Sequence, residues 1–396
     1  MAYKVKSRTS YGQRLSGSLK GIVTGIILFL VGTVLLFKNE GSFVKEKKAI
    51  NETQSVTTHI SDLSGIDGSL NGKVIHATAL ANTTDVVTDG DFGVSATALT
   101  LSRNVEYFQF EEHVSTKNVN KTGGSQETTK TYTYKKAWVS RPIDAEKFED
   151  PEYQSANTTL TVIESETFTA ENVTFDAYRL PPFMVRSISG STDLTFELAP
   201  ERLQYWENLI SKTPAGTDTM PMVHQHGNVI YFGKSEMNPN IGDVRITFTK
   251  VEPKEISIIG KVNNNTFESY IAKNGNSFYS VAIGSVSAEN MFSDAHSSNS
   301  MWTWLLRLLG LLLVMIGLWT MFSILPMLFK VLPFLGSIVG AGVGTVCVIF
   351  GFAWSLLIVS LAWLFFRPLI GIPLLLVAVA GIWYLKKKGE KKEDVK

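Results

Sequence analysis

Cysteine is almost absent from this chain of 396 residues, which contains only Cys347, inside an apolar run. A single cysteine cannot form a disulfide within the chain and cannot supply a thiolate cluster for a metal. Charge is scarce as well, since Asp, Glu, Lys and Arg make up 18% of the residues against roughly 25% in an ordinary soluble protein. The shortage is concentrated near the two ends of the chain, where long apolar runs indicate a membrane protein.

Motifs of catalysis are also missing. The sequence has no Walker loop, no Rossmann glycine pattern, no G-x-S-x-G and no H-E-x-x-H. His224 and His226 would share one face of a strand, and His76 and His113 are the histidines that could join them. Two imidazoles do not make a metal site, so these are predicted to be surface histidines. We expect no enzymatic activity, no cofactor and no bound metal.

Three pairs of acidic residues could in principle act as acid and base or bind calcium. Neighbouring residues in a strand point to opposite faces, and no D-x-D-x-D-G loop occurs. The prediction for all three is therefore solvated charge. The pairs are Glu111 with Glu112, Glu149 with Asp150, and Asp89 with Asp91.

A formal net charge of +1 conceals an uneven distribution along the chain. Residues 1–20 hold five basic and no acidic residues, and residues 386–396 hold six lysines against three acidic residues. Residues 38–300 instead hold 23 basic and 33 acidic residues. An acidic domain does not suit phosphate contacts, so nucleic acid is not an expected partner.

Four apolar segments are long enough to cross a bilayer. Residues 21–37 are uncharged, and the polar stretch after them lacks the small-residue cleavage site of a signal peptide, so we predict an anchor. Lys330 and Arg367 divide the apolar C-terminal part into three further spans. The predicted transmembrane segments are 21–37, 303–325, 337–366 and 369–385.

The positive-inside rule predicts the orientation of these spans. Four crossings leave both termini on the same side, and the basic residues at 1–20 and 386–396 predict that this side is cytoplasmic. The acidic segment 38–300 would then lie in a lumen or a periplasm.

Between the first two spans, the sequence is rich in Thr, Ser and Asn with alternating apolar residues, which is typical of antiparallel strands. The clearest pattern predicts a long hairpin of Asn104–Thr116 and Glu127–Val139 around Gly123 and Gly124. Helices are predicted only from Pro200 to Lys212 and over Ser287–Ser298. Further strands are predicted at 72–80, 159–166, 193–198, 228–232, 243–251, 256–262 and 278–283. The expected fold is an α+β membrane protein with four transmembrane helices and a large antiparallel β-rich extramembrane domain.

Small residues recur every four positions in two of the spans. Such residues lie on one face of a helix and allow the backbone of another helix to approach closely. They are predicted to serve helix packing or oligomerisation, within one protomer or between protomers. These glycines are Gly21, Gly25, Gly336, Gly340 and Gly344.

The chain resembles the transmembrane protein 43 family, also called LUMA, over nearly its whole length. The matching phrases include Gln13-Arg14-Leu15 and Asn39-Glu40-Gly41 around the first span, Val105-Glu106-Tyr107-Phe108-Gln109, and Tyr132, Tyr134, Trp138, Ser140, Ile143 and Phe148. They continue with Gly242-Asp243, Arg245 and Phe248, with Ser287-Ala288-Glu289 and Asn299-Ser300-Met301, and with Trp363-Leu364-Phe365 before Arg367-Pro368-Leu369.

This resemblance implies a four-span, homo-oligomeric membrane protein with a large lumenal domain and no established catalytic residues. In animals, the family lies in the endoplasmic reticulum and inner nuclear membrane, where it associates with emerin and lamins and organises the envelope. The Thr- and Asn-rich strands and the single cysteine lead us to expect a bacterial member, which would lie in the inner membrane with a periplasmic domain. In a eukaryote the location would be the endoplasmic reticulum or inner nuclear membrane.

The function predicted from the sequence is a non-enzymatic, oligomeric membrane scaffold that organises the envelope through its β-rich domain. Its expected partners are the lipid bilayer, further copies of the chain, and membrane or envelope proteins that the sequence does not identify. A channel or transporter is an alternative, although the predicted spans contain no Asp, Glu or His. A membrane-tethered hydrolase is a second alternative and would need a catalytic constellation hidden in the β-rich domain.

Overall fold

The computed structural model describes residues 2–210, 222–369 and 372–373. The described residues form three long α-helices and three shorter ones. They are α1 (Tyr11–Val56), α2 (Pro182–Arg186), α3 (Pro200–Ile210), α4 (Ala288–Phe322), α5 (Ile324–Phe329) and α6 (Pro333–Phe366).

The strands form two larger sheets and two separate ribbons. The first sheet contains β1 (Tyr3–Thr9), β6 (Thr100–Asn120), β7 (Gln126–Val139), β8 (Glu166–Thr169), β11 (Thr192–Asp193), β12 (Val223–His226), β13 (Val229–Phe232) and β14 (Val244–Val251). The second contains β2 (Thr57–His59), β3 (Val74–Asn82), β9 (Val173–Phe175), β10 (Tyr178–Leu180), β15 (Lys254–Asn263), β16 (Thr266–Glu268) and β19 (Ser280–Ile283). The ribbons are β4 (Val86–Asp89) with β5 (Val94–Thr97), and β17 (Tyr270–Ile271) with β18 (Ser277–Phe278).

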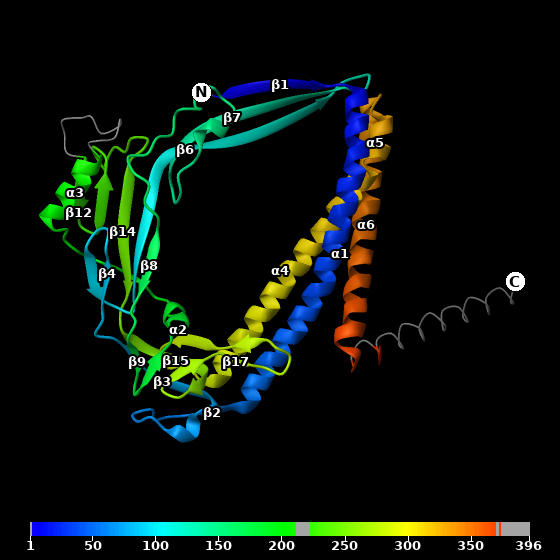
Figure 1. Ribbon diagram of the computed structural model, residues 1–396. Helices are drawn as coiled ribbons and strands as arrows, with labels where there is room; N and C mark the ends of the chain where they lie inside the picture. Colours follow the sequence, from blue (N-terminus) through cyan, green and yellow to red (C-terminus); the bar gives the residue numbers. More distant parts are fainter. Residues whose placement is uncertain (1, 211–221, 370–371, 374–396) are drawn as a thin grey trace, which may run out of the picture.

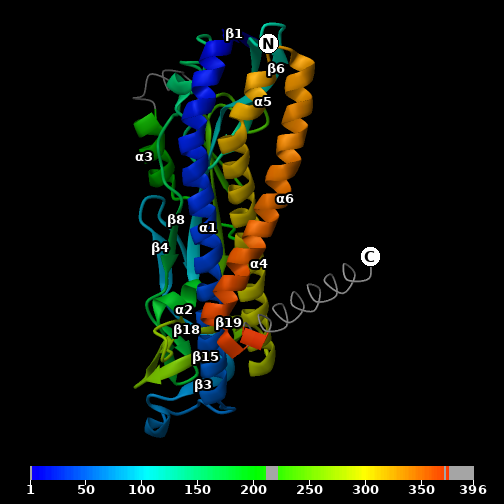
Figure 2. The same ribbon diagram turned by 90° about the vertical axis from the view of Figure 1, so that its right-hand side faces the viewer.

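The molecule has the form of a closed frame, with the long helices along one side and the sheets along the other (Figure 1). The hairpin of β6 and β7 runs across one end of the frame to the start of α1. At the other end, the second sheet lies beside the last turns of α1 and the first turns of α4 (Figure 1). The view in Figure 2 shows α1, α4 and α6 side by side, with α1 continuing below the end of α6 to the level of β15 and β3.

Helix α1 is much longer than the span predicted inside it. Its start is fixed by a capping box, in which Ser10 Oγ accepts from the Gln13 N–H and Gln13 Oε1 accepts from the Ser10 N–H. At 1.5 Å per residue, its 46 residues extend over about 69 Å. The predicted span 21–37 is therefore only the middle of a helix that continues into the β-rich part of the molecule.

The second half of the bundle is also built from long helices. Ser287 caps α4, which runs without interruption from the short helix predicted at Ser287–Ser298 into the span predicted at 303–325 and ends at Phe322, just before α5. The predicted break at Lys330 is confirmed, since α5 ends there and α6 begins at Pro333. Among the described residues, three helical segments are long and apolar enough to cross a membrane. The fourth predicted span, 369–385, falls almost entirely outside the described residues, so a fourth crossing is not confirmed.

The predicted hairpin is confirmed, with antiparallel register from the Tyr107–Val139 pair to the Asn120–Gln126 pair. Both glycines of its turn have positive φ, +88° at Gly123 and +79° at Gly124, a backbone region that glycine adopts without steric cost. In the rest of the sheet β6 pairs with β14, β14 with β13, and β13 with β12, all antiparallel. A continuous apolar core lies between the two larger sheets and includes Tyr107, Phe175, Phe232 and Phe248, all almost fully buried.

Two predicted strands are wrong for a shared physical reason, which is that side chains accept hydrogen bonds from some of the backbone N–H groups and no continuous ladder of backbone hydrogen bonds forms. In segment 159–166 the Ile163 N–H donates to the Tyr107 hydroxyl at 2.8 Å. In segment 193–198 the Leu198 N–H donates to Gln225 Oε1 at 2.8 Å. Periodicity alone cannot distinguish such a satisfied irregular segment from a strand. The predicted helix at Pro200 is confirmed as α3.

Candidate functional site at the junction of the helices and the β-rich domain

A buried charge cluster joins the three long helices near one end of the frame. We define it as Glu40 on α1, Arg307 on α4 and Arg367 just after α6. The Glu40 carboxylate is fully buried, and Arg307 donates to it from Nε at 2.5 Å and from Nη2 at 2.9 Å. Trp363 Nε1 donates to Glu40 Oε2 at 2.9 Å, and Arg367 Nη2 lies 3.8 Å from the same oxygen. Two guanidinium groups and one carboxylate leave this cluster with a formal charge of +1.

The cluster exists because α1 remains helical beyond its apolar stretch. One position before Glu40, the Asn39 Nδ2 donates to the backbone oxygen of Thr303 at 3.0 Å, which fixes the register of α1 against α4. A bidentate pair between Arg and a carboxylate holds both groups in one geometry, and its cost of desolvation is offset only while both partners stay in place. The packing of α4 against α1 thus pairs Arg307 with a carboxylate 267 positions away in the sequence.

Aromatic rings surround the charge cluster. The Arg307 guanidinium lies 4.6 Å from the ring centre of Trp304, and that of Arg367 lies 4.7 Å from the ring centre of Phe43. Trp302, Trp304 and Phe365 are largely exposed at the same level of the bundle. Because Trp side chains prefer the headgroup layer of a bilayer, these exposed aromatic residues indicate the expected level of a membrane interface.

Polar side chains tie the same end of the bundle to the second sheet and its neighbouring ribbon. Glu52 of α1 accepts from the Tyr270 hydroxyl at 2.8 Å and from the Lys273 N–H at 3.1 Å. Asn276 Nδ2 donates to Glu46 at 2.8 Å. These bonds connect α1 to the β17–β18 ribbon without an intervening linker, so this end of the bundle and the β-rich domain form one packed unit.

A second junction lies at the opposite end of the bundle, and we call it the clasp. It consists of β1, the hairpin tip at Gly123 and Gly124, and the turn at Val331. β1 pairs with β7 in seven antiparallel positions. Arg14 Nη1 donates to the Gly124 oxygen at 2.7 Å, and the Gly123 N–H donates to the Val331 oxygen at 2.9 Å. Residues 1–20 were predicted to be a basic N-terminal segment, and no strand was predicted there.

The two junctions enclose the apolar stretch of α1. The β-rich domain bonds to Arg14 before this stretch and to the backbone of Lys45 after it, where Asn274 Nδ2 donates to the Lys45 oxygen at 2.6 Å. These residues are 31 positions apart, which is roughly 46 Å along a helix. The same polar domain therefore holds α1 at both ends of the segment predicted to cross the membrane.

Helices α1 and α4 approach one another at a glycine seam formed by Gly25, Gly32, Gly310 and Gly317. A Cβ added at Gly25 would lie 2.6 Å from the Gly317 oxygen, and one at Gly317 would lie 2.6 Å from the Phe29 nitrogen. Similarly, a Cβ at Gly32 would lie 2.9 Å from the Gly310 oxygen. Only glycine fits at these positions, which lets the two backbones meet directly.

The predicted glycines occupy different environments. Gly25 belongs to the seam, whereas a Cβ at Gly21 would make only ordinary contacts with Thr320. Gly336 lies against Lys330 of its own turn, and Gly344 lies against the Trp319 ring. Gly340 has room, since a Cβ there would meet only Pro326, at 3.6 Å. The role of these glycines in oligomerisation stays a prediction, and the seam partners Gly32, Gly310 and Gly317 were missed because they repeat every seven positions rather than every four.

Replacing Gly317 by alanine is expected to destabilise the bundle by about 1 to 3 kcal/mol, because the added methyl group would push against the α1 backbone. The matched control is Gly340→Ala, where the methyl group makes an ordinary contact and the change should be small. Thermal unfolding in mild detergent would compare the two variants. Equal stability of both would mean that α1 and α4 do not meet at the seam.

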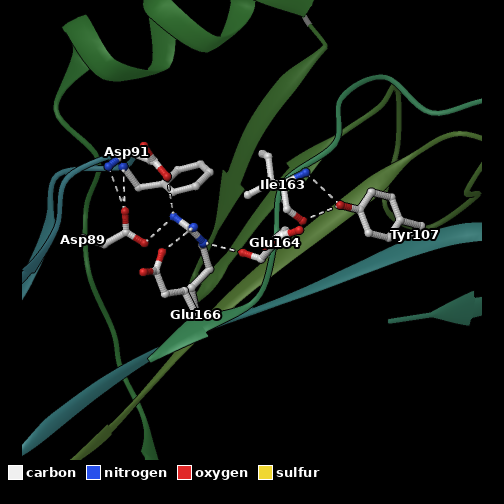
Figure 3. A network of polar contacts seen from close by, with 8 residues as sticks. Asp89, Asp91, Tyr107, Ile163, Glu164 and Glu166 are labelled. Carbon is white, nitrogen blue, oxygen red and sulfur yellow. Dashed lines mark hydrogen bonds and ion pairs between the residues drawn. The ribbon is translucent and has the colours of Figure 1, made fainter. Parts of the chain in front are cut away.

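A polar network centred on Arg103 fixes the β4–β5 ribbon to the first sheet, and Figure 3 labels its acidic partners Asp89, Asp91 and Glu166. Arg103 Nη1 lies 2.7 Å from Asp89 Oδ2 and 2.9 Å from Asp91 Oδ2, and Arg103 Nη2 lies 3.4 Å from Glu166 Oε2. Asp89 is fully buried and its Oδ1 accepts from the Asp91 N–H at 2.9 Å. The prediction of solvated charge is therefore wrong for Asp89. Every oxygen named here is bonded within the protein, which supports a structural role for the network.

The two other acidic pairs also include groups bonded within the protein. Glu112 Oε2 accepts from the Tyr134 hydroxyl at 2.6 Å and from the Glu149 N–H at 2.8 Å. Asp150 is buried, and its Oδ1 accepts from the Glu152 N–H at 3.1 Å. These carboxylates stabilise the loop that follows β7, a function that their spacing in the sequence did not indicate.

The four histidines do not come together, and the prediction of surface histidines is wrong for His76, which is buried. His224 and His226 are on β12 with ring centres 6.1 Å apart, and His113 Nε2 lies 3.9 Å from Glu111 on β6. His76 is on β3 in the other sheet, where its Nδ1 lies 2.9 Å from Nδ1 of His59. Within the described residues, no group of three or more His, Cys, Asp or Glu has a metal-binding arrangement.

The His59–His76 pair controls one contact between the second sheet and the start of α4. His76 Nε2 lies 2.9 Å from the Val286 oxygen, which only accepts, so this nitrogen carries the proton and Nδ1 accepts from His59. Burial lowers the pKa of the His76 imidazole, and the neighbouring His59 lowers it further against the opposing effect of the Val286 bond. Protonation of His76 would place two N–H groups against each other.

Stability should therefore depend on pH through His76. With a lowered pKa, the folded protein takes up this proton less readily than the unfolded chain, so the contribution is complete above about pH 6.5 and declines as the pH falls below it. The slope for one proton is at most about 1.4 kcal/mol per pH unit. Thermal unfolding between pH 8 and 5 should show a smaller decline for His76→Gln, which keeps a donor and an acceptor. A decline identical to that of the wild type would exclude His76 as its source.

Several residues that carried the family resemblance lie together on the first sheet. Arg245 Nε lies 2.6 Å from Glu106 Oε2, and the Arg245 guanidinium is stacked 4.3 Å from the ring centre of Trp138. The Tyr231 hydroxyl donates to Asp243 Oδ2 at 2.5 Å, and burial raises the pKa of the Asp243 carboxyl. These contacts join β6, β7, β13 and β14, so the residues stabilise the base of the hairpin.

Comparison with known proteins agrees with this architecture. The sequence profile described as "Transmembrane protein 43" matches residues 107–368. Transmembrane protein 43 of Rattus norvegicus is 26% identical over 367 residues, which cover 90% of this chain and 87% of the rat protein. The Homo sapiens protein is 25% identical over 376 residues (92% and 89%), and the Drosophila melanogaster homolog is 25% identical over 370 residues (91% and 93%). No solved structure matches the chain.

These relatives are animal proteins, and the bacterial source expected from composition stays a prediction. The profile covers about two-thirds of the sequence and includes the hairpin, most of the β-rich domain, α4 and α6. The chain therefore belongs to the transmembrane protein 43 family.

Proposed function

We propose that this protein is a non-enzymatic, homo-oligomeric integral membrane scaffold that organises the surrounding envelope through its β-rich domain. The observation that carries the proposal is the set of bonds between α1 and the β17–β18 ribbon, where Glu52 accepts from Tyr270 and Lys273 and Glu46 accepts from Asn276. A domain that is bonded directly to a membrane helix, without a linker, holds a fixed orientation relative to the bilayer, as a scaffold requires. Its partners are proposed to be the bilayer, further copies of the chain, and membrane or envelope proteins.

The β-rich domain is proposed to be extracytoplasmic. Its acidic composition and the basic ends of the chain support this orientation through the positive-inside rule. The compartment would be the periplasm in a bacterium, or the lumen of the endoplasmic reticulum and inner nuclear membrane in a eukaryote.

The state of assembly tests the scaffold proposal. Light scattering of the full chain in mild detergent should give a protein mass that is a multiple of 43.7 kDa and does not change on dilution through the micromolar range. A particle of one chain at every concentration would contradict an oligomeric scaffold. Ion flux into liposomes that contain the protein would instead favour the alternative of a channel.

A further inference from the structure

An apolar cavity lies between α4 and α6 beside Leu36 of α1. Its volume is about 460 Å³, within the range of pockets that hold small ligands. The walls are almost entirely apolar and include Leu308, Leu311, Phe352 and Val359. At one end the lining includes Arg307 of the charge cluster and Trp363, whose ring centre lies 5.2 Å from the guanidinium of Arg367.

The length of the cavity corresponds to one leaflet of a bilayer. Its lining on α6 extends from Phe352 to Trp363, which is 11 positions or roughly 16 Å along the helix. The hydrocarbon core of a bilayer is about 30 Å thick, so one leaflet occupies about half of it. The end at Trp363 lies at the level of the exposed Trp302 and Trp304, where the headgroup layer is expected.

The charge at this end is unbalanced. Arg307 is neutralised by Glu40, but Arg367 has no carboxylate of its own. Its Nη2 is buried without a hydrogen-bond partner among the described residues and lies 3.8 Å from the shared Glu40 oxygen. A buried guanidinium N–H without an acceptor is costly, and an anion beside it would satisfy both its charge and its donor.

From these observations we infer that the cavity binds an anionic phospholipid of the surrounding bilayer. One acyl chain fills the space between α4 and α6, and the phosphate group of the lipid accepts hydrogen bonds from Arg367 and Arg307. The net charge of +1 selects an anionic lipid over a zwitterionic one with the same acyl chains. The bound lipid becomes part of the charge cluster that joins the three long helices.

Native mass spectrometry of the full chain in mild detergent tests this inference, with dioleoylphosphatidylglycerol and dioleoylphosphatidylcholine as probes. The wild type should retain one phosphatidylglycerol per chain with at least fivefold preference over phosphatidylcholine, since one basic residue near a membrane surface contributes about 1 kcal/mol. Arg367→Gln should abolish the preference and leave the Glu40–Arg307 pair intact. Arg367→Lys should restore most of it.

A second pair of variants tests the cavity rather than the charge. Ser360→Phe places a ring in the cavity and should reduce the retention of both lipids, whereas Leu357→Phe, on an exposed position outside the lining, should not. Thermal unfolding without added lipid verifies that each variant is folded. Equal retention of the two lipids by the wild type, or an unchanged preference in folded Arg367→Gln, would overturn the inference. So would a wild-type chain that retains neither lipid, as expected if residues 374–385 of the chain filled the cavity.

Discussion

A cysteine pair introduced as Ser7→Cys and Thr128→Cys should form a disulfide in native membranes, in a background that carries Cys347→Ala. Ser7 of β1 and Thr128 of β7 are directly opposite in the antiparallel register. Opposite positions in such a pair have Cα atoms about 4.5 to 5.5 Å apart, within the range that a disulfide bridges. The bond should be detected after mild oxidation as a faster migration on a non-reducing gel that is reversed by a reductant.

The control pair is Ser7→Cys with Thr131→Cys. Thr131 is opposite Lys4, three positions away, or roughly 10 Å along the strand, and should give no intramolecular bond. The effect expected from the clasp is therefore a nearly complete bond in one pair and none in the other.

This result bears directly on the orientation of the chain in the membrane. The clasp places residues 3–9 and the hairpin tip together, whereas the charge distribution predicts a cytoplasmic N-terminus and an extracytoplasmic domain. If residues 21–37 cross the bilayer between the two junctions, the closed clasp and the charge-based orientation are incompatible. The polar strands of the β-rich domain would then have to cross the hydrocarbon core beside α1. In the closed frame, Ser10→Cys and Thr122→Cys should react equally with an impermeant maleimide in intact cells.

Absence of the Ser7–Thr128 bond, together with labelling of Thr122→Cys alone, would show that the clasp is open in the membrane. The orientation predicted from the charge distribution would then hold, and the bonds between α1 and the β17–β18 ribbon would be what attaches the β-rich domain to the helices.

The elements that could be predicted from the sequence are those with a local signal. Period-two alternation and two glycines were sufficient for the β6–β7 hairpin, because both strands and their turn lie within 40 residues. The apolar stretches and the charges at Lys330 and Arg367 located the last residue of α4 and both ends of α6 to within a few residues. The extension of α1 to Val56 was missed because its last turns are polar and their apolar contacts come from β18 and α4.

The features that could not be predicted depend on partners distant in the sequence. Glu40 is an ordinary surface-type residue until Arg307 and Arg367 are placed beside it by the packing of three helices. β1 has no strong pattern of its own, and its pairing requires the end of a hairpin more than 110 positions away. Asp89 was expected in solvent, because the residues next to it in the sequence gave no indication that Arg103 on β6 would pair with it.

Replacing Arg307 by methionine should destabilise the bundle by about 3 to 5 kcal/mol, because the buried Glu40 carboxylate loses its bidentate partner and keeps only the looser contact with Arg367 at 3.8 Å. Urea unfolding in mild detergent, followed by tryptophan fluorescence, would measure the loss. The removal of a surface cation, as in Lys147→Met, is the control and should change little, since the Lys147 side chain is 81% exposed.

The double variant Glu40→Met with Arg307→Met separates the two contributions to this loss. A buried ion pair can often be replaced by apolar residues of similar volume without loss of stability, whereas removal of one partner leaves an uncompensated charge. We therefore expect the double variant to regain most of the stability that Arg307→Met loses. If instead the double variant is as unstable as the single one, the pair itself holds α1 against α4, and its bonds contribute more than the desolvation of the two groups costs. A single variant as stable as the wild type would mean that Glu40 is not buried between the helices in the membrane.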